Sequence, residues 1–262
     1  MTLPRKWTAI ALFVLSMATV SPLGHAQPSD PAPVIQPVVL GEMPHDPTAF
    51  TEGFELGSGT AGPVLYEGTG EVGESQLREL DPVTGKVLRA VDVPGDYFAE
   101  GITVVGDRIW QLTYTDGVAV EWDRATLTPV REVPLNPQGW GLCRDGDRLI
   151  RSDGTSRLRF QDPGDLTETG GVDVTRDGRA VPGLNELECV DGAVWANVWP
   201  TDTLVRIDPA SGRVNLVVDA AGLRARGIPP SAQVLNGIAH VTGDEFLLTG
   251  KDWPTTFRVR LG

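Results

Sequence analysis

The sequence predicts an all-β fold, a five-bladed β-propeller, and three observations support this prediction. Glycine and proline supply 31 and 21 of the 262 residues, and turn formers at that density are typical of many short strands. A short segment recurs five times along the chain, and a similar succession of apolar strands follows each copy. The hydrophobic content of 40% is enough for a packed core, which excludes general disorder.

The recurring segment consists of a large or polar side chain, usually a glycine, and then a hydrophobic residue that favours a strand. The five copies are Glu52-Gly53-Phe54, Glu100-Gly101-Ile102, Trp140-Gly141-Leu142, Asn185-Glu186-Leu187 and Asn236-Gly237-Ile238. Successive copies are 40 to 51 residues apart. Four short strands in roughly 40–50 residues is the period of a propeller blade, so five copies predict five blades.

The remaining strands of each blade follow in order. The second strands are expected at Leu65–Glu67, Ile109–Gln111, Leu149–Arg151, Val194–Ala196 and Phe246–Leu248. The third strands end at turns that carry an acid, namely Asp81, Asp123, Asp162 and Asp208. Fourth strands resume at Lys86–Val91, Val130–Val133, Gly171–Val174 and Arg213–Val218.

The last unit lacks a fourth strand, because the chain ends soon after Thr256–Leu261. We expect the strand Val38-Val39-Leu40 to supply it and to close the ring, which removes free sheet edges. No composition shift interrupts the array. Residues 38–262 are therefore predicted to form one propeller domain.

The first 37 residues are expected to lie outside this domain. Arg5 and Lys6 precede an apolar run from Thr8 to Val20, and Gly24-His25-Ala26 offers a cleavage site. About 13 apolar residues are too few for the roughly 20 that span a bilayer. We therefore predict a signal peptide over residues 1–26, an extended proline-rich leader over 27–37, and an exported protein, periplasmic or secreted, with no membrane attachment after cleavage.

The charge excludes one class of partner. The chain carries 35 acidic and 22 basic residues, a formal net charge of −13. An acidic surface repels phosphate backbones, so nucleic-acid binding is not expected.

The cysteines and histidines are few. Cys143 and Cys189 each lie in an apolar strand, where a free cysteine packs as a small hydrophobic residue. We expect free thiols, although an oxidising compartment also permits a disulfide between them. The histidines are scattered and form no zinc-ligand pattern with cysteine, so no metal centre is predicted.

Equivalent positions of the repeat face the propeller axis, and they form two sets. The first hub set is Glu52, Glu100, Trp140, Asn185 and Asn236, and the second hub set, after the next strand, is Gly70, Tyr114, Gly154, Trp199 and Lys251. Aromatic and polar side chains that converge in this way describe a small pocket with an apolar wall. Residue by residue, other interpretations stay open: a solvated Glu100 or one paired with Lys251, tryptophans that merely pack between blades, and a surface lysine.

Two further motifs carry acidic or nucleophilic side chains. Glu186 and Glu188 lie at i and i+2 of one strand, so their carboxylates share a face and are able to hold a cation. Ser152-Asp153-Gly154 is interpreted as a turn, because no histidine lies near to activate the serine.

Together these segments resemble the plant-type and bacterial glutamine cyclotransferases, from about residue 43 to the C-terminus. The matching stretches are His45-Asp46-Pro47, Phe50-Thr51-Glu52-Gly53, Phe98-Ala99-Glu100-Gly101-Ile102-Thr103, Gln111-Leu112-Thr113-Tyr114, Gly139-Trp140-Gly141-Leu142, Ser152-Asp153-Gly154, Leu184-Asn185-Glu186-Leu187-Glu188, Ala196-Asn197-Val198-Trp199, Leu235-Asn236-Gly237-Ile238-Ala239 and Thr249-Gly250-Lys251-Asp252-Trp253-Pro254. The resemblance implies a five-bladed propeller.

The resemblance also implies an activity: cyclisation of the N-terminal glutamine of peptides to pyroglutamate with release of ammonia. It implies Glu100 as the acid and base, without a required metal or cofactor; a structural calcium is not predicted, and a monomer is expected. The implied substrate-binding residues are Phe50, Glu52, Phe98, Tyr114, Trp140, Asn185, Trp199 and Lys251. The chain departs from the family at Glu52, often Gln, at Tyr114, often Trp, and at Gln138, often Glu, which affects the expected substrate contacts rather than the reaction.

Two alternatives belong to other classes of function. In a calcium-dependent, lactonase-like propeller, Glu52, Asn185 and Asn236 would grip one cation at the axis. In a non-catalytic propeller, the same face would bind a partner.

Overall fold

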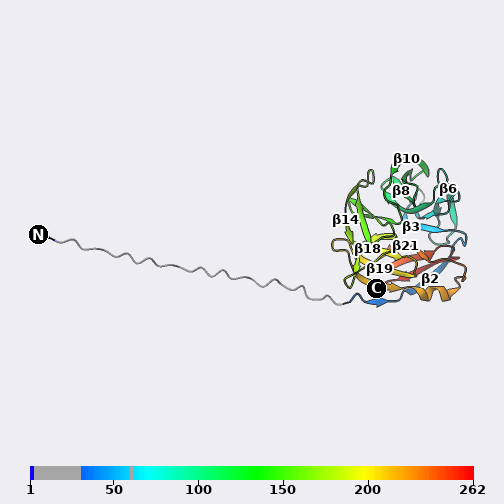
Figure 1. The fold of residues 1–262 in the computed structure, drawn as a ribbon. Helices are drawn as coiled ribbons and strands as arrows, with labels where there is room; N and C mark the ends of the chain where they lie inside the picture. Colours follow the sequence, from blue (N-terminus) through cyan, green and yellow to red (C-terminus); the bar gives the residue numbers. More distant parts are fainter. Residues whose placement is uncertain (3–30, 60–61) are drawn as a thin grey trace. The chain divides into compact units, whose positions relative to one another are not determined.

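The computed structural model describes residues 1–2, 31–59 and 62–262. Its folded unit, Pro31–Gly262, consists of strands and, among the described residues, a single 3₁₀ helix, η1 (Ala221–Arg226) (Figure 1). The expectation of an all-β, propeller-like fold is confirmed. The predicted signal peptide and residues 27–30 of the predicted leader lie outside the described residues, apart from Met1 and Thr2. No helix in the described ranges is long and apolar enough to cross a membrane.

Three of the sheets have four strands each, in sequential antiparallel order. The first contains β3 (Thr51–Ser58), β4 (Pro63–Thr69), β5 (Gln76–Leu80) and β6 (Val87–Asp92). The second contains β7 (Ala99–Val105), β8 (Arg108–Thr113), β9 (Val118–Asp123) and β10 (Thr128–Pro134). The third contains β11 (Leu142–Asp145), β12 (Arg148–Arg151), β13 (Arg157–Gln161) and β14 (Glu168–Asp173).

Two further sheets complete the unit. One contains β17 (Leu184–Val190), β18 (Ala193–Val198), β19 (Thr203–Asp208) and β20 (Arg213–Asp219), extended by β15 (Thr175–Arg176) and β16 (Arg179–Ala180). The other contains β21 (Leu235–Thr242), β22 (Glu245–Gly250), β23 (Thr255–Arg260) and β2 (Val38–Pro44). The short β1 (Val34–Ile35) pairs in parallel with β20, so part of the expected leader belongs to the folded unit.

Strand β2 supplies the missing strand of the last sheet, as the sequence predicts. It pairs antiparallel with β23, from Val38 opposite Arg260 to Pro44 opposite Thr255. The two ends of the domain thus meet in one sheet, and the edge of β23 is covered.

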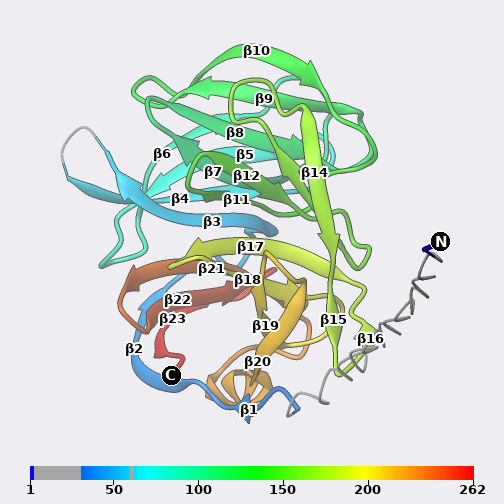
Figure 2. The same cartoon turned by 90° about the vertical axis from the view of Figure 1, so that its left-hand side faces the viewer.

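The first strands of the five sheets form a closed circuit of contacts. Strand β3 contacts β7, β7 contacts β11, β11 contacts β17, β17 contacts β21, and β21 returns to β3. Figure 2 shows β3, β17 and β21 side by side at the centre of the unit. The hydrophobic clusters lie between these sheets, with residues such as Trp110, Trp122 and Phe257 fully buried.

The glycine of the repeat is explained by close approach between neighbouring first strands. A Cβ at Gly101 would lie 2.5 Å from the carbonyl oxygen of Trp140, and one at Gly141 would lie 2.1 Å from that of Asn185. The amide of Gly101 donates a hydrogen bond to that Trp140 oxygen at 2.7 Å. Any larger side chain would separate the strands.

The acid-bearing turns after the third strands also have a physical cause. The Asp81 carboxylate accepts hydrogen bonds from the amides of Val83 and Thr84, and Asp208 accepts one from Ala210. Asp123 and Asp162 bond the following turn in the same way. Such side-chain-to-backbone bonds favour a tight reversal between strands.

The expectation of free thiols is wrong, because Cys143 and Cys189 form a disulfide. Cys143 lies on β11 and Cys189 on β17, two adjacent first strands, and their Cα atoms are 5.4 Å apart. The apolar surroundings suggested by the sequence are real, since Cys143 is buried. The sequence did not show that the two thiols face each other across the sheets.

We expect the variant Cys143→Ala/Cys189→Ala to fold but to lose stability. The bridge joins residues 46 apart, and constraining such a loop in the unfolded chain is worth about 4 kcal/mol. Denaturant unfolding without reductant measures the loss, with reduced wild-type protein as the matched control. An unfolding free energy equal to that of the oxidised wild type would contradict the prediction.

Candidate active site

Both hub sets gather at the same end of the sheets. Glu52, Glu100, Asn185 and Asn236 lie near the start of a first strand, and Trp140 lies two residues before one. The second hub set follows the second strands, and backbone bonds place it beside the entry to the first strands: Gly70 donates to Phe50 at 2.8 Å and Tyr114 to Phe98 at 2.9 Å. The equivalent repeat positions chosen from the sequence therefore lie together at one end of the axis.

Five aromatic side chains form a continuous arc there. The ring centroids of Phe50 and Phe98 are 5.8 Å apart, those of Phe98 and Tyr114 5.9 Å, those of Tyr114 and Trp140 6.3 Å, and those of Trp140 and Trp199 5.8 Å. All five are residues that the resemblance assigned to substrate binding. Trp199 and Tyr114 are 48% and 38% exposed, which places them at the open side of the arc.

Two members of the second hub set are glycines because an aromatic ring packs closely against each of them. A Cβ at Gly70 would lie 2.6 Å from the Phe98 ring, and one at Gly154 would lie 2.6 Å from the Trp140 ring. These glycines therefore make room for aromatic side chains of the arc, and they do not mark ligand contacts of their own.

A buried ion pair closes the arc. The Lys251 ammonium bonds Glu52 Oε1 and lies 4.4 Å from the centroid of the Phe50 ring. The other Glu52 oxygen accepts a 2.9 Å hydrogen bond from Asn236 Nδ2. Lys251 is thus neither a surface lysine nor the partner of Glu100, two possibilities that the sequence had left open.

Glu100 is the acid without a cation of its own. Its side chain is buried, and burial raises its pKa well above the ordinary value; the negative charge of neighbouring Glu52 and a hydrogen bond to it add to the rise in pKa. Burial also raises the pKa of Glu52, but the Lys251 ammonium opposes that rise in pKa. The Lys251 ammonium thus favours the charged form of Glu52, and the Glu52 charge favours the protonated form of Glu100.

Four buried polar atoms of the first hub set have no hydrogen-bond partner within the described part of the chain. They are Glu100 Oε2, Trp140 Nε1, Asn185 Oδ1 and Asn236 Oδ1. Leaving such atoms unpaired costs roughly 1–3 kcal/mol each, and each comes from a different sheet. Donors and acceptors at the end of the axis that carries the aromatic arc fit a small ligand with both amide and amine groups.

Ser152 has a role that the sequence interpretation missed. Its buried hydroxyl donates to the Asn185 carbonyl oxygen at 2.6 Å and accepts from the Gly141 amide at 2.7 Å. It therefore ties the third sheet to the Asn185 backbone. Asn236, which the first hub set included but the resemblance did not assign, anchors Glu52. The sequence signal that could have identified Ser152 and Asn236 is a short polar side chain at or near a hub position.

The carboxylates of Glu186 and Glu188 bind backbone rather than an obvious cation. Glu186 accepts from the amides of Phe54 at 3.3 Å and Ile238 at 2.9 Å, and Glu188 accepts from His240 at 3.0 Å. Glu186 thus joins β17 to two other first strands. Within the described ranges, no group of three or more His, Cys, Asp or Glu residues is arranged to hold a metal ion.

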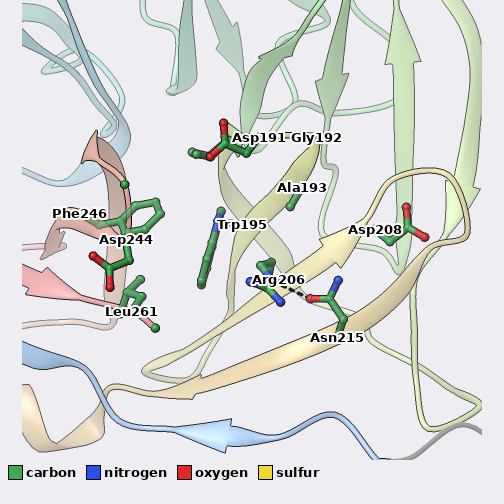
Figure 3. Close-up of a pocket in the computed structure, with 13 residues that line it drawn as sticks. Asp191, Gly192, Ala193, Trp195, Arg206, Asp208, Asn215, Asp244, Phe246 and Leu261 are labelled. Atoms are coloured by element: carbon green, nitrogen blue, oxygen red, sulfur yellow. Dashed lines mark hydrogen bonds between the residues drawn. The ribbon is translucent and has the colours of Figure 1, made fainter.

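A separate cavity of about 430 Å³ lies at the other end of β17 and β18. Trp195, Arg206 and Phe246 line it (Figure 3), beside the Asp191–Gly192 turn. It contains no member of either hub set, so the candidate site stays at the aromatic arc.

The substitution Glu52→Gln tests the electrostatics of the pair. Removing the Glu52 charge is expected to lower the pKa of Glu100, because that charge and the shared hydrogen bond favour the protonated Glu100. A ¹³C carboxyl titration, with the Glu100 signal identified by its loss in Glu100→Gln, measures the shift. Glu245→Gln is the control, because Glu245 bonds Arg258 and begins β22, at the opposite end of that strand from Lys251. An unchanged Glu100 titration in Glu52→Gln would contradict the assignment.

Comparisons with known proteins agree with this geometry. Residues 9–261 match the family model described as glutamine cyclotransferase. A glutaminyl-peptide cyclotransferase of Arabidopsis thaliana is 38% identical over 229 residues, covering 85% of this chain and 70% of the relative. The crystal structure of Myxococcus xanthus glutaminyl cyclase superposes with a TM-score of 0.80 at 34% identity, covering 87% of this chain and 97% of that one. This chain belongs to the glutamine cyclotransferase family.

Proposed function

We propose that Glu100 is the acid and base with which this glutaminyl-peptide cyclotransferase converts the N-terminal glutamine of peptides to pyroglutamate and ammonia. The observation that supports this proposal most directly is the position of the Glu100 carboxyl. It is buried at the hub, it has one oxygen without a partner, and it lies beside the charged Glu52.

The reaction suits a site of this composition. The α-amine of the substrate attacks its own γ-carboxamide carbon, a carbon–nitrogen bond forms to close a five-membered ring, and the bond to the amide nitrogen breaks. Both reacting groups belong to one residue, so positioning supplies much of the rate. We propose that the aromatic arc holds that residue in its reactive shape and excludes water, while the exposed side near Tyr114 and Trp199 leaves room for the rest of the peptide.

Proton transfer is the remaining task. The attacking amine has an ordinary pKa of about 7.7–8.0, so part of it is neutral near pH 7.5. In the tetrahedral intermediate, Glu100 gives its proton to the departing amide nitrogen, and the resulting carboxylate takes a proton from the attacking nitrogen. Glu100 ends the cycle as it began, and ammonia leaves with the proton it received.

The oxygen that gains charge in the intermediate needs donors. Trp140 Nε1 is a buried donor without a partner, and the Asn185 side-chain amide lies in the same part of the hub. We propose that these two groups bind the oxygen, with the Lys251 ammonium adding charge stabilisation through its place beside Glu52. The Lys251 contribution is electrostatic, because its ammonium is already bonded to Glu52.

The lactonase-like alternative is less well supported. It needs Glu52 and Asn236 as cation ligands, but these two residues bond each other, and the Lys251 ammonium already compensates the Glu52 charge. We therefore propose a reaction that requires no metal or cofactor. A non-catalytic role would not explain why four residues of the first hub set bury polar atoms that have no partner among the described residues.

We infer that the five sheets are the blades of a closed five-bladed propeller, which the circuit of first-strand contacts supports. We infer export to the periplasm or the medium, with residues 1–26 removed; the disulfide supports an oxidising compartment. We expect the mature protein to act as a monomer on peptides and proteins that begin with glutamine.

The substitution Glu100→Gln tests the proposal. It keeps the size of the side chain but removes the transferable proton, so kcat for ammonia release from a glutamine-initiated dipeptide is expected to fall by about 10²–10⁴-fold, with little change in KM. A coupled ammonia assay, with and without chelator, measures it. Glu245→Gln is the control. Near-normal turnover in Glu100→Gln would eliminate Glu100 as the acid and base.

A further inference from the structure

A buried charge network lies directly behind the Glu52–Lys251 pair. His45 Nε2 is 2.8 Å from Glu67 Oε1, and His45 Nδ1 is 2.7 Å from the carbonyl oxygen of Trp253. The side chains of His45 and Glu67 are 1% and 0% exposed. None of these groups belongs to the aromatic arc or to either hub set.

The geometry favours a charged His45. Both partners of its ring are acceptors, a carboxylate and a carbonyl, and only an imidazolium donates from both nitrogens. Burial alone lowers the pKa of His45, yet the charge and hydrogen bond of Glu67 and the Trp253 carbonyl bring the pKa above the ordinary 6.5. The other charged groups facing the ring are Asp46 and, through Glu67, Arg78; the Phe54 ring packs edge-on.

The network reaches both ends of the Glu52–Lys251 pair. On one side, Glu67 Oε1 also accepts a 2.8 Å hydrogen bond from the Thr51 hydroxyl, and Thr51 immediately precedes Glu52. On the other side, the Trp253 carbonyl lies two residues after Lys251.

Backbone bonds align the same two segments. His45 N donates to the Pro254 carbonyl and Asp252 N to the Ala49 carbonyl, each at 2.9 Å. Asp252 has a positive φ of 62°, a conformation that a non-glycine residue adopts only when its surroundings hold it. The loop that carries Lys251 is therefore held in place by contacts with the segment that carries Glu52.

We propose that His45 and Glu67 are positioning residues for the cyclisation, and that the protonated His45 holds Glu52 and Lys251 in the arrangement that keeps the proton on Glu100. Neither residue touches the substrate. When His45 loses its proton, one ring nitrogen turns from donor to acceptor, and its bond to Glu67 or to Trp253 is lost. We therefore expect activity to decline at alkaline pH as His45 loses its proton.

Thr51→Val is the mildest test. It is nearly isosteric, changes no charge and removes only the hydroxyl bond to Glu67. We expect kcat to fall about tenfold, the size expected for one buried hydrogen bond, with little change in KM, and Thr51→Ser to restore it. Wild-type kcat in a folded Thr51→Val protein would overturn the proposal.

Glu67→Gln tests the charge. Without the carboxylate the pKa of His45 falls, so the alkaline loss of kcat is expected to begin about one pH unit or more lower than in wild type. A role limited to stability would lower the unfolding temperature but leave the pH profile of the folded enzyme in place. His240→Gln is the matched control, because His240 bonds only Gly243 through its ring and lies at the other end of β21; its kcat and pH profile should match wild type.

A third measurement does not depend on activity. In ring-¹⁵N NMR spectra, the signals that disappear in His45→Gln should show both nitrogens protonated at pH 7. A neutral tautomer for those signals would overturn the proposal even if the variants were impaired. A lost activity with an unshifted pH profile in Glu67→Gln would do the same. If the wild-type protein released no ammonia from glutamine-initiated peptides, that result would instead contradict the proposed function.

Discussion

The close approach of the first strands at the axis is the constraint on which the rest of the molecule depends. With Gly101 and Gly141 in the repeat, backbone lies against backbone, and no Cβ separates neighbouring sheets. The residues just before these glycines are Glu100 and Trp140. Glu100 and Trp140 thus come from adjacent first strands at the same end of the axis, since the amide of Gly101 donates to the Trp140 carbonyl.

The fourth copy of the repeat satisfies the same constraint differently. Glu186 replaces the glycine, and its carboxylate accepts the amides of Phe54 and Ile238 from two other first strands. Burial of this acid raises its pKa well above the ordinary value, and nearby Glu188 raises that pKa further. A side chain that elsewhere would push strands apart here joins them, at the cost of a buried acid. The Cys143–Cys189 bridge adds a covalent link at the neighbouring junction of β11 and β17.

Charge is distributed unevenly between the hub and the layer behind it. At the hub, two acids, Glu52 and Glu100, lie near one ammonium, that of Lys251, and burial raises the pKa of both acids. Behind it, His45 and Glu67 form a second pair. Burial raises the pKa of Glu67, but the charge and hydrogen bond of His45, the Arg78 charge and the Thr51 hydrogen bond together outweigh that rise and lower the pKa. The second pair is stabilising between two limits. The Glu67 contribution is lost as pH falls through its lowered pKa, and the His45 contribution is lost as pH rises through a pKa above 6.5. The His45–Glu67 ion pair is therefore complete at pH values between the lowered pKa of Glu67 and the raised pKa of His45.

The sequence by itself determined the order of the four main strands in each sheet, the closing role of Val38–Leu40 and the membership of the hub, but not the short strands β1, β15 and β16. These follow from local patterns: strand alternation, turn residues such as Asp81 and Asp208, and a repeat register that places equivalent residues at equivalent points of the axis. Only the tertiary structure decided which groups touch. Lys251 pairs with Glu52 and not with Glu100, the two cysteines bond, and His45 reaches Trp253, 208 residues away. Such pairings depend on differences of an ångström or two between side chains on separate sheets, and a repeat register does not encode distances that small.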